Sequence, residues 1–243
     1  MRNSMRIDVL DTKFDNLTME EALDRGCELM EKRCGAYVVT PNPEIVLLCR
    51  ENAEMARAVE EAPLVIADGI GVIYGAKILG TPLKEKLPGI DFTAALMQRM
   101  AEKGQSVFLF GAKPGVAEKA AENIARRFPG IKIAGTNDGY FTDDAPIVEK
   151  INAARPDLLR VCLGAPKQEL WMRSHAGSLD AGLMIGAGGS MDVFAGTVAR
   201  APEFWQKAGL EWFYRLVKEP RRIGRMMKLP KFLLLVMARR AGG

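Results

Sequence analysis

Short apolar runs alternate along this chain with longer stretches in which apolar residues recur at helical spacing. The apolar runs lie at 36–40, 64–68, 106–111, 131–135, 158–164 and 183–189. The amphipathic stretches between them include 43–61, 90–103, 114–128 and 166–175. Short strands that alternate with helices are typical of βαβ units. The pattern therefore predicts an α/β fold with a mostly parallel sheet and helices on both faces.

The N-terminal segment precedes this alternation. Residues 6–14, RIDVLDTKF, predict an early strand or a hairpin. Thr18 follows, and its spacing to Glu21 fits a capping box, in which each residue bonds the backbone N–H of the other. We therefore expect a helix to begin directly after Thr18.

The predicted strands end in loops that are rich in glycine and polar residues. These loops are Thr40–Asn42, Asp68–Gly69, Gly111–Lys113, Asn137–Gly139, Gly164–Gln168 and Gly188–Ser190. Ligands of open α/β sheets bind beyond the carboxyl ends of the strands. Turns between strands and helices are often rich in Gly and Asp for structural reasons alone, but so many together favour a ligand that carries phosphate.

Asp68 stands at the end of a buried run and directly before Gly69. A carboxylate there has three interpretations: it caps the next helix, it binds a metal, or it acts as a catalytic base. The segment GIGVIYG, Gly69 to Gly75, nearly matches the dinucleotide-binding fingerprint. An NAD- or nucleotide-binding Rossmann oxidoreductase is therefore an alternative function.

The segment GAPKQELW, residues 164–171, predicts a helix that begins near Pro166. Lys167 and Gln168 would then flank the helix N-terminus, where the helix dipole and a lysine both attract anions. A first turn that is merely solvated is an equal alternative. Gln168 both donates and accepts hydrogen bonds, which suits a sugar hydroxyl.

The scarcity of histidine narrows the chemistry. His175 is the sole histidine, which argues against most zinc sites and against a Ser-His-Asp triad. The chain has no D-x-D motif, and its nearest approximation is Asp143-Asp144. We therefore expect a site without metal or cofactor that works with carboxylates, amides, Lys and Arg.

Cysteine usage and hydropathy point to the cytoplasm. None of the four cysteines forms a C-x-x-C pair, as is typical of reduced thiols in a cytosolic protein. No apolar run approaches the roughly 18 residues of a spanning helix. The N-terminus has no apolar core of a signal peptide.

The positive charge is concentrated in the last fifth of the chain. Residues 196–243 hold 11 Lys and Arg against three Asp and Glu, whereas residues 1–195 carry a balance of −4. We therefore expect a body over 1–195 and a C-terminal appendage over 196–243. Its mixture of arginines and aromatic residues suits an anionic membrane surface. Nucleic-acid binding, a plain helical cap and a non-catalytic membrane scaffold are the other interpretations.

Several stretches, in their order and combination, resemble the WecG/TagA/CpsF family of bacterial glycosyltransferases. They are TPNPEIV, ADGIGV, GIDF, FLFGAKPGVAEKA, GYF, LGAPKQELW, GAGGSMDVFAG and the segment from RAP to GLEWFYRLVKEPRRIGR. The resemblance implies a Rossmann-like body with a C-terminal appendage. It also implies transfer of N-acetylmannosamine or a related sugar from a UDP-sugar to undecaprenyl-diphosphate-linked N-acetylglucosamine, in teichoic acid or surface-polysaccharide assembly.

The resemblance also assigns residues. It makes Asp68 the general base of an inverting transfer, and this is the interpretation of Asp68 that we adopt. The substrate-binding residues it implies are Thr40, Asn42, Lys86, Gly111, Gln168, Gly188, Asp192, Arg215, Arg222 and Arg225. Lys86 stands where the family often has an arginine, which keeps the charge but loses the planar fork that binds phosphate at two points.

The implied partners are a UDP-sugar donor, a polyprenyl-diphosphate-linked N-acetylglucosamine acceptor and an anionic membrane surface. Nucleic acid is not expected, and a homo-oligomer stays open. The resemblance places the protein in the cytoplasm, peripheral on the inner face of the cell membrane.

Overall fold

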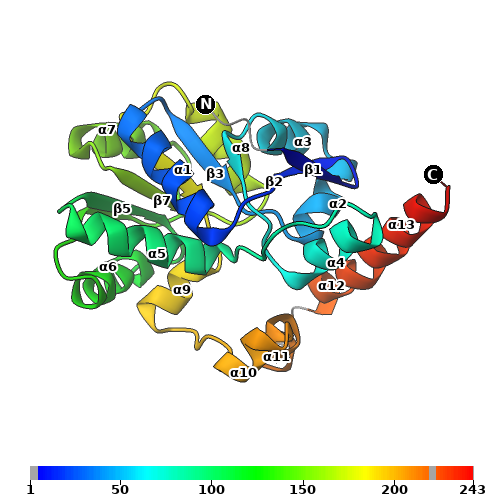
Figure 1. The fold of residues 1–243 in the computed structure, drawn as a ribbon. Coiled ribbons are helices and arrows are strands. Elements are labelled where there is room, and N and C mark those ends of the chain that lie inside the picture. The colour runs from blue at the N-terminus through cyan, green and yellow to red at the C-terminus, as the bar shows by residue number, and fades with distance from the viewer. Residues whose placement is uncertain (1–4, 219–222, 243) are drawn as a thin grey trace.

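A parallel sheet of six strands forms the centre of the described chain (Figure 1). The computed structural model describes residues 5–218 and 223–242, and the side chains of these residues other than 207, 215, 225 and 226. The strands lie in the order β4-β3-β8-β7-β5-β6. Their bounds are β3 Ala36–Val39, β4 Leu64–Val65, β5 Ser106–Gly111, β6 Lys132–Asn137, β7 Leu158–Cys162 and β8 Leu183–Gly186. The predicted α/β fold is confirmed.

Helices cover both faces of this sheet (Figure 1). Those of the body are α1 Met19–Lys32, α2 Pro43–Glu51, α3 Ala53–Glu60, α4 Ile70–Ile78, α5 Gly89–Glu102, α6 Val116–Arg127, α7 Ala145–Ala154, α8 Lys167–His175 and α9 Ser190–Ala195. The appendage adds α10 Glu203–Lys207, α11 Glu211–Lys218, α12 Ile223–Met226 and α13 Lys228–Gly242.

A hairpin precedes the sheet, as the sequence indicated. Its antiparallel strands are β1 (Arg6–Val9) and β2 (Thr12–Asp15). The two residues between them, Leu10 and Asp11, have φ of +54° and +70°, the conformation that a tight two-residue hairpin loop requires. Thr18 then caps α1 in the predicted capping box with Glu21.

The predicted helix 43–61 is wrong in one respect, because the structure divides it at Asn52. Asn52 is extended, with φ −138° and ψ 109°, and ends α2. Its side chain then accepts a hydrogen bond from the N–H of Met55 at 3.0 Å and so caps α3. Asparagine favours such a cap because its short side chain competes with the helical backbone for hydrogen bonds.

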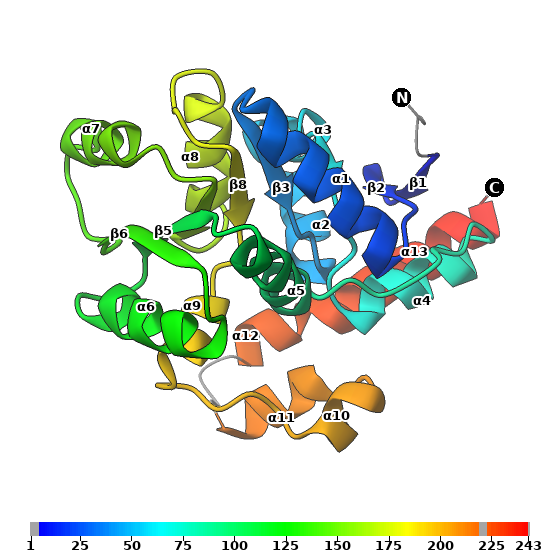
Figure 2. The same ribbon diagram turned by 60° about the vertical axis from the view of Figure 1, so that its left-hand side comes forward.

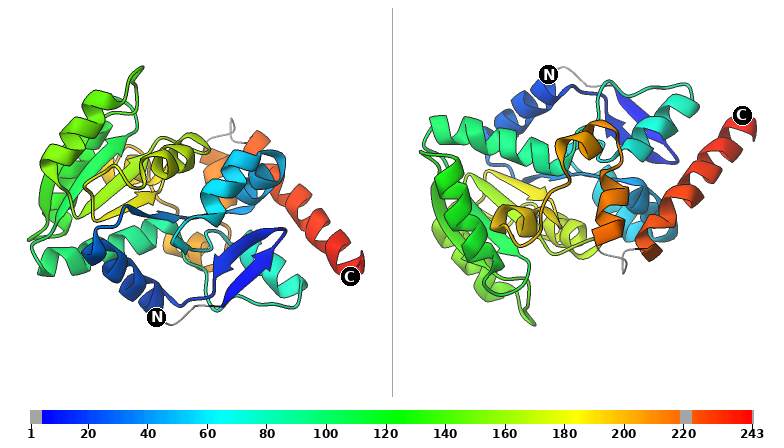
Figure 3. Two further views of the ribbon diagram at one scale, coloured as in Figure 1. Left: turned by 90° about the horizontal axis from the view of Figure 1, so that it is seen from above. Right: turned by 90° about the horizontal axis from the view of Figure 1, so that it is seen from below.

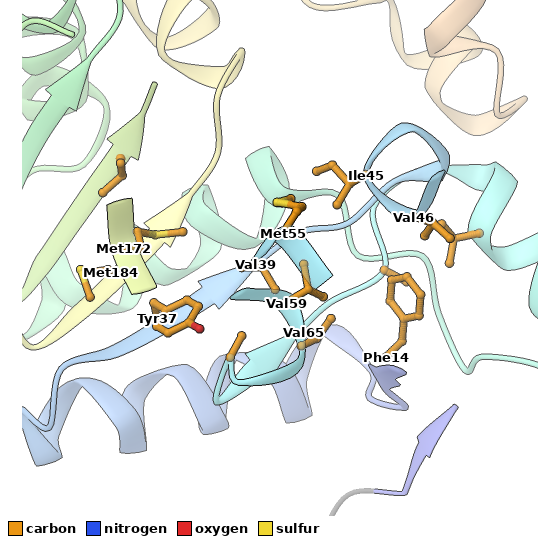
Figure 4. Packing of buried hydrophobic residues seen from close by; sticks show 14 of the residues in the cluster. Phe14, Tyr37, Val39, Ile45, Val46, Met55, Val59, Val65, Met172 and Met184 are labelled. Carbon is orange, nitrogen blue, oxygen red and sulfur yellow. The ribbon is translucent and has the colours of Figure 1, made fainter. Parts of the chain in front are cut away.

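The sheet separates two apolar layers, since alternate strand residues point to opposite faces. In the layer of Figure 4, Tyr37 and Val39 of β3 pack with Met55 and Val59 of α3 and with Met172 of α8. The other layer lies beneath α1, α5, α6 and α9. This arrangement leaves the ends of the strands, rather than the faces, open to a ligand.

The long helix α13 returns to the body and packs along α2 and α4 (Figure 2). Phe232 and Val236 of α13 are fully buried and belong to the same apolar layer as the hairpin. Seen from below, α10 and α11 lie across the body (Figure 3). Within the described residues, no helix combines the length and the apolar character needed to cross a membrane.

Candidate active site

A cavity of about 330 Å³ opens at the carboxyl ends of β4, β3, β8 and β7. The chain runs outward from β3 to β4 and then returns across the sheet to β5, so the order of the strands reverses here. Such a reversal leaves a crevice between the loops, and ligands of α/β proteins bind in it. Six of the predicted site residues line the cavity: Thr40, Asn42, Asp68, Lys86, Gln168 and Gly188.

Asp68 lies on the cavity wall directly after β4. Its backbone N–H donates to the carbonyl of Pro41 at 3.1 Å, which holds this segment against the loop after β3. Helix α4 has Gly69 as its N-cap residue, with φ +88°, and no side chain caps it. The N-cap residue of α4 is therefore Gly69 and not Asp68, and Asp68 lines the cavity on a backbone anchored to the loop after β3.

Thr40 and Asn42 follow β3 and have structural partners as well as a place in the cavity wall. The hydroxyl of Thr40 donates to the carbonyl of Gly186 at 3.2 Å and joins the ends of β3 and β8. The side-chain oxygen of Asn42 accepts from the N–H of Ile45 at 3.0 Å and caps α2. These hydrogen bonds fix the Thr40 side chain to the end of β8 and the Asn42 side chain to the start of α2.

Gln168, in the first turn of α8, is buried and has its amide fixed at both ends. Its oxygen accepts from the N–H of Gly164 at 3.2 Å, and its nitrogen donates to Oε1 of Glu169 at 2.7 Å. Glu169 is itself buried, and burial raises the pKa of its carboxyl. The amide nitrogen carries two N–H groups and donates one of them to Glu169, so Gln168 has its second N–H left to offer a ligand.

Glycine turns form the part of the wall next to Gln168. Gly164 has φ +77°, and a side chain at Gly164 or Gly189 would meet nothing within 4 Å. A side chain at Gly188 would instead approach the oxygen of Gln168 at 3.1 Å. The backbone is therefore open to a ligand at the first two positions. Lys86 contributes a half-buried ammonium to the same cavity.

The appendage supplies a further part of the wall. Its contributions are Gly209, Glu211, Trp212 and Leu229. Gly209 has φ +70°, and a side chain there would approach Ile70 of α4 at 3.1 Å, so the appendage closely approaches the start of α4. The sequence indicated an appendage but assigned none of these four residues. They stand 141 or more positions from Asp68 along the chain, and no local motif marks them.

An ion pair beside the cavity was also not predicted. The two terminal nitrogens of Arg200 donate to the two carboxylate oxygens of Asp91 at 2.5 and 2.7 Å. These bonds raise the pKa of Arg200, and the charges of Glu211 and Asp68 raise it further. The pair thus joins the start of α5 to the beginning of the appendage, close to Asp68.

The remaining predicted residues lie elsewhere or are not described. Neither Gly111 of β5 nor Asp192 of α9 lines the cavity. Gly111 has φ +119° and lacks a side chain where β5 closely approaches the carbonyl of Cys162. Arg215 falls in α11 and Arg225 in α12, and their side chains are not described. Arg222 lies outside the described residues.

The geometry combines a carboxylate, a fixed amide donor, open glycine turns and an ammonium around one cavity. A carboxylate can accept a proton from a hydroxyl, and the donors can hold an anion. In the described part of the chain, no group of three or more His, Cys, Asp or Glu side chains could hold a metal ion.

Comparison with known proteins gives a consistent picture. Residues 7–243 match the sequence profile described as the glycosyl transferase WecG/TagA/CpsF family. A relative from Bacillus spizizenii, named N-acetylglucosaminyldiphosphoundecaprenol N-acetyl-beta-D-mannosaminyltransferase, is 38% identical over 208 residues, which are 86% of this chain and 81% of the relative. A relative with the same name from Staphylococcus aureus is 33% identical over 233 residues, 95% of this chain and 92% of the relative.

Proposed function

Since this chain belongs to the WecG/TagA/CpsF family of glycosyltransferases, we propose that it transfers N-acetylmannosamine from a UDP-sugar to undecaprenyl-diphosphate-linked N-acetylglucosamine. The names of the two relatives support this donor sugar and this acceptor. The observation that carries the proposal is the cavity, in which Asp68 lies among open glycine turns and a lysine. A product of this kind serves teichoic acid or related surface-polymer assembly.

Asp68 is the proposed general base. The acceptor hydroxyl loses its proton to the Asp68 carboxylate as its oxygen attacks C1 of the donor sugar. UDP leaves from the opposite face, which inverts the configuration at C1. The position of Asp68 on an anchored backbone supports this role, because a base must be held within hydrogen-bond reach of the proton it accepts.

The departing UDP carries charge that the enzyme must stabilise. Lys86 and the backbone N–H group of Gly189 are the proposed donors in the described part of the cavity. The appendage arginines Arg215, Arg222 and Arg225 are proposed to add positive charge, and the transfer is proposed to need no metal. Thr40, Asn42, Gln168 and Gly188 are proposed to contact the sugars, whereas Gly111 and Asp192, which do not line the cavity, stay predictions from the resemblance.

Docking on the inner face of the cell membrane is part of the proposal. The appendage exposes large apolar side chains, namely Phe204, Leu210, Phe213, Val217, Ile223, Met227, Leu234 and Met237. Apolar side chains beside basic residues favour the interface of an anionic bilayer. A lipid-linked acceptor stays in the bilayer, so the cavity must be brought to the surface.

The glycines of GIGVIYG give no support to the oxidoreductase alternative. A side chain at Gly71 would meet Leu229 at 2.6 Å, and one at Gly75 would meet Phe232 at 2.8 Å. These two glycines lie in α4 and make room for α13. The spacing therefore has a packing explanation that needs no dinucleotide.

The test is UDP release from UDP-N-acetylmannosamine with a short-chain diphosphate-linked N-acetylglucosamine acceptor. UDP-N-acetylglucosamine and the uronic acid of UDP-N-acetylmannosamine serve as competing donors. We expect release to need the acceptor, to favour UDP-N-acetylmannosamine and to survive excess EDTA. Faster release with another donor would reject the proposed sugar, and loss of activity that Mg²⁺ restores would reject metal independence.

A further inference from the structure

An arginine lies in the middle of the parallel sheet, next to the cavity. Arg160 of β7 is fully buried. Its strand partners are Leu109 of β5 and Ile185 of β8, so its side chain enters the apolar layer beneath α6 and α9. Arginine is among the residues least often fully buried without a partner. An apolar residue would complete this layer equally well, so packing does not explain the charge.

The guanidinium has few partners. One terminal nitrogen donates to the hydroxyl of Ser190 at 2.5 Å, and the group lies 4.6 Å from the ring centre of Phe194. The other terminal nitrogen and Nε are buried and have no hydrogen-bond partner. Among the described residues, no carboxylate lies within ion-pair distance of Arg160.

The neighbouring thiol does not supply the missing negative charge. Burial raises the pKa of Cys162, so the thiol stays neutral. An unpaired charge in a dry interior is costly, and replacing such a charge with an apolar side chain often stabilises a protein. A counter-charge that arrives only with a ligand would explain the arrangement.

Ser190 connects Arg160 to the cavity. Its hydroxyl accepts from Arg160 and donates to the carbonyl of Ala187 at 2.6 Å, while the residue itself lines the cavity beside Gly188 and Gly189. The guanidinium of Arg160 is thus separated from the cavity by Ser190, to which it donates one hydrogen bond. In a medium of low dielectric, a charge at this depth acts on the cavity with little screening.

We propose that Arg160 is a positioning residue, which acts through Ser190 and makes the cavity select ligands that carry a diphosphate. The inference rests on the proposed function, in which the donor is a UDP-sugar. Arg160 orients the Ser190 hydroxyl and contributes a fixed positive charge to the wall. It therefore favours UDP over uridine, which has the same base and ribose without the phosphates.

The experiment compares the affinities of UDP and uridine for wild-type protein and for Arg160→Met, by titration followed with ligand-observed NMR. We expect Arg160→Met to weaken UDP binding about tenfold, a size typical of losing one nearby charge, and to leave uridine binding within about twofold. Thermal unfolding of the same samples should show a Tm equal to or above that of wild type, because a buried charge has been removed.

Two further variants sharpen the comparison. Arg160→Lys keeps the charge and should retain most of the preference for UDP. Arg127→Met is the matched control, because Arg127 is exposed and also approaches the Phe194 ring, at 5.7 Å, and it should change neither affinity.

Each outcome decides between the explanations. Folded Arg160→Met that binds UDP like wild type, or that weakens UDP and uridine equally, overturns the inference. If Arg160→Met does not fold, Arg160→Lys decides, since loss of the UDP preference with the charge retained also overturns it. Wild-type protein that fails to bind UDP would instead reject the donor class of the proposed function.

Discussion

At the scale of single residues, the site depends on a carboxylate whose backbone is anchored and whose neighbours are cationic. Asp68 is held by the bond from its N–H to Pro41, and its charge contributes to the raised pKa of Arg200. The anchored backbone holds Asp68 in the cavity wall, where it can meet the hydroxyl of an acceptor.

Asp68→Asn should lower kcat by about 10²–10⁴, the usual contribution of general-base assistance, because an amide cannot accept the proton. UDP affinity should stay within about threefold, since the amide keeps the shape of the side chain. UDP-release kinetics and UDP titration measure the two quantities. Wild-type turnover by the Asn variant would remove Asp68 from the mechanism, whereas an unfolded variant would point to a structural role.

Glu169 is the second informative residue, because it is a buried carboxyl that fixes a cavity amide. Burial raises its pKa above the ordinary 4.5. As the pH rises from about 4.5 towards the raised pKa of the folded state, the unfolded chain loses the proton of this carboxyl before the folded chain does. The folded state then binds more protons, so its stability falls with rising pH until the folded-state pKa is passed.

Glu169→Gln should remove this loss, because glutamine does not titrate and its oxygen can still accept from Gln168. We expect the Tm of the variant to match wild type near pH 4.5 and to exceed it by a few degrees at pH 8, as about 1 kcal/mol shifts a chain of this size by about 2–4 °C. Turnover should stay within about threefold. Glu169→Ala, which leaves the Gln168 nitrogen without its acceptor, should lose far more activity. A Tm difference that is flat with pH would show that Glu169 titrates normally.

At the scale of elements, two glycines one helical turn apart let α13 pack closely on α4. Gly71 and Gly75 face Leu229 and Phe232, and Phe232 is fully buried. Small residues at this spacing allow two helices to approach, since positions four apart lie on one helical face. The same contact holds Leu229 in the cavity wall, so the packing of α13 and the shape of the site are coupled.

Gly75→Ala should destabilise the protein, although alanine is the better helix former by about 1 kcal/mol. The new methyl group would lie 2.8 Å from a ring carbon of Phe232, which is buried and has no room to move. Gly224→Ala in α12 is the control, because a side chain there meets nothing within 4 Å.

Thermal unfolding measures the stability of both variants. A double-mutant cycle with Phe232→Ala then tests whether the new methyl group acts through its contact with Phe232. The double variant Gly75→Ala with Phe232→Ala should lose less stability than the sum of the single changes. Strict additivity would show that the methyl group disturbs something other than Phe232.

At the scale of the whole molecule, the appendage both completes the cavity and carries the exposed apolar surface. It cannot be removed cleanly, because Phe232 and Val236 are part of the core of the body. Truncation at residue 196 would expose that core to water. A loss of membrane docking could then not be distinguished from a loss of folding. Surface substitutions are therefore the better test of membrane association.

The double variant Val217→Asp with Ile223→Asp should weaken sedimentation with anionic vesicles about tenfold at low salt, since both side chains are exposed and the change adds two negative charges. Turnover of a soluble acceptor analogue should stay within about twofold. Met5→Asp is the control, because Met5 is also exposed but directly precedes β1, which lies away from α10 and α11 (Figures 1 and 2). Equal sedimentation of all three proteins would reject docking through this surface.

The sequence by itself determined the elements and the loops that carry polar residues. Strand and helix periods, the capping box at Thr18 and the hairpin could be predicted because they depend on neighbours within a few positions. The loops that hold Thr40, Asp68 and Gln168 could be placed at one edge, because parallel strands bring their carboxyl ends together. The break at Asn52 was missed, since the apolar pattern continues across it.

Only the tertiary structure decided which distant segments complete the site. Residues 91 and 200 pair across 109 positions, and Glu211 and Trp212 reach the cavity through the path of the appendage. The spacing of GIGVIYG left dinucleotide binding open as an alternative, and only the structure shows that Leu229 and Phe232 of α13 lie beside Gly71 and Gly75. Arg160 looked like one residue of an apolar run, and only its burial, with two unpartnered nitrogens, reveals a charge behind the cavity wall. These features depend on long-range packing, which leaves no periodic signal in the chain.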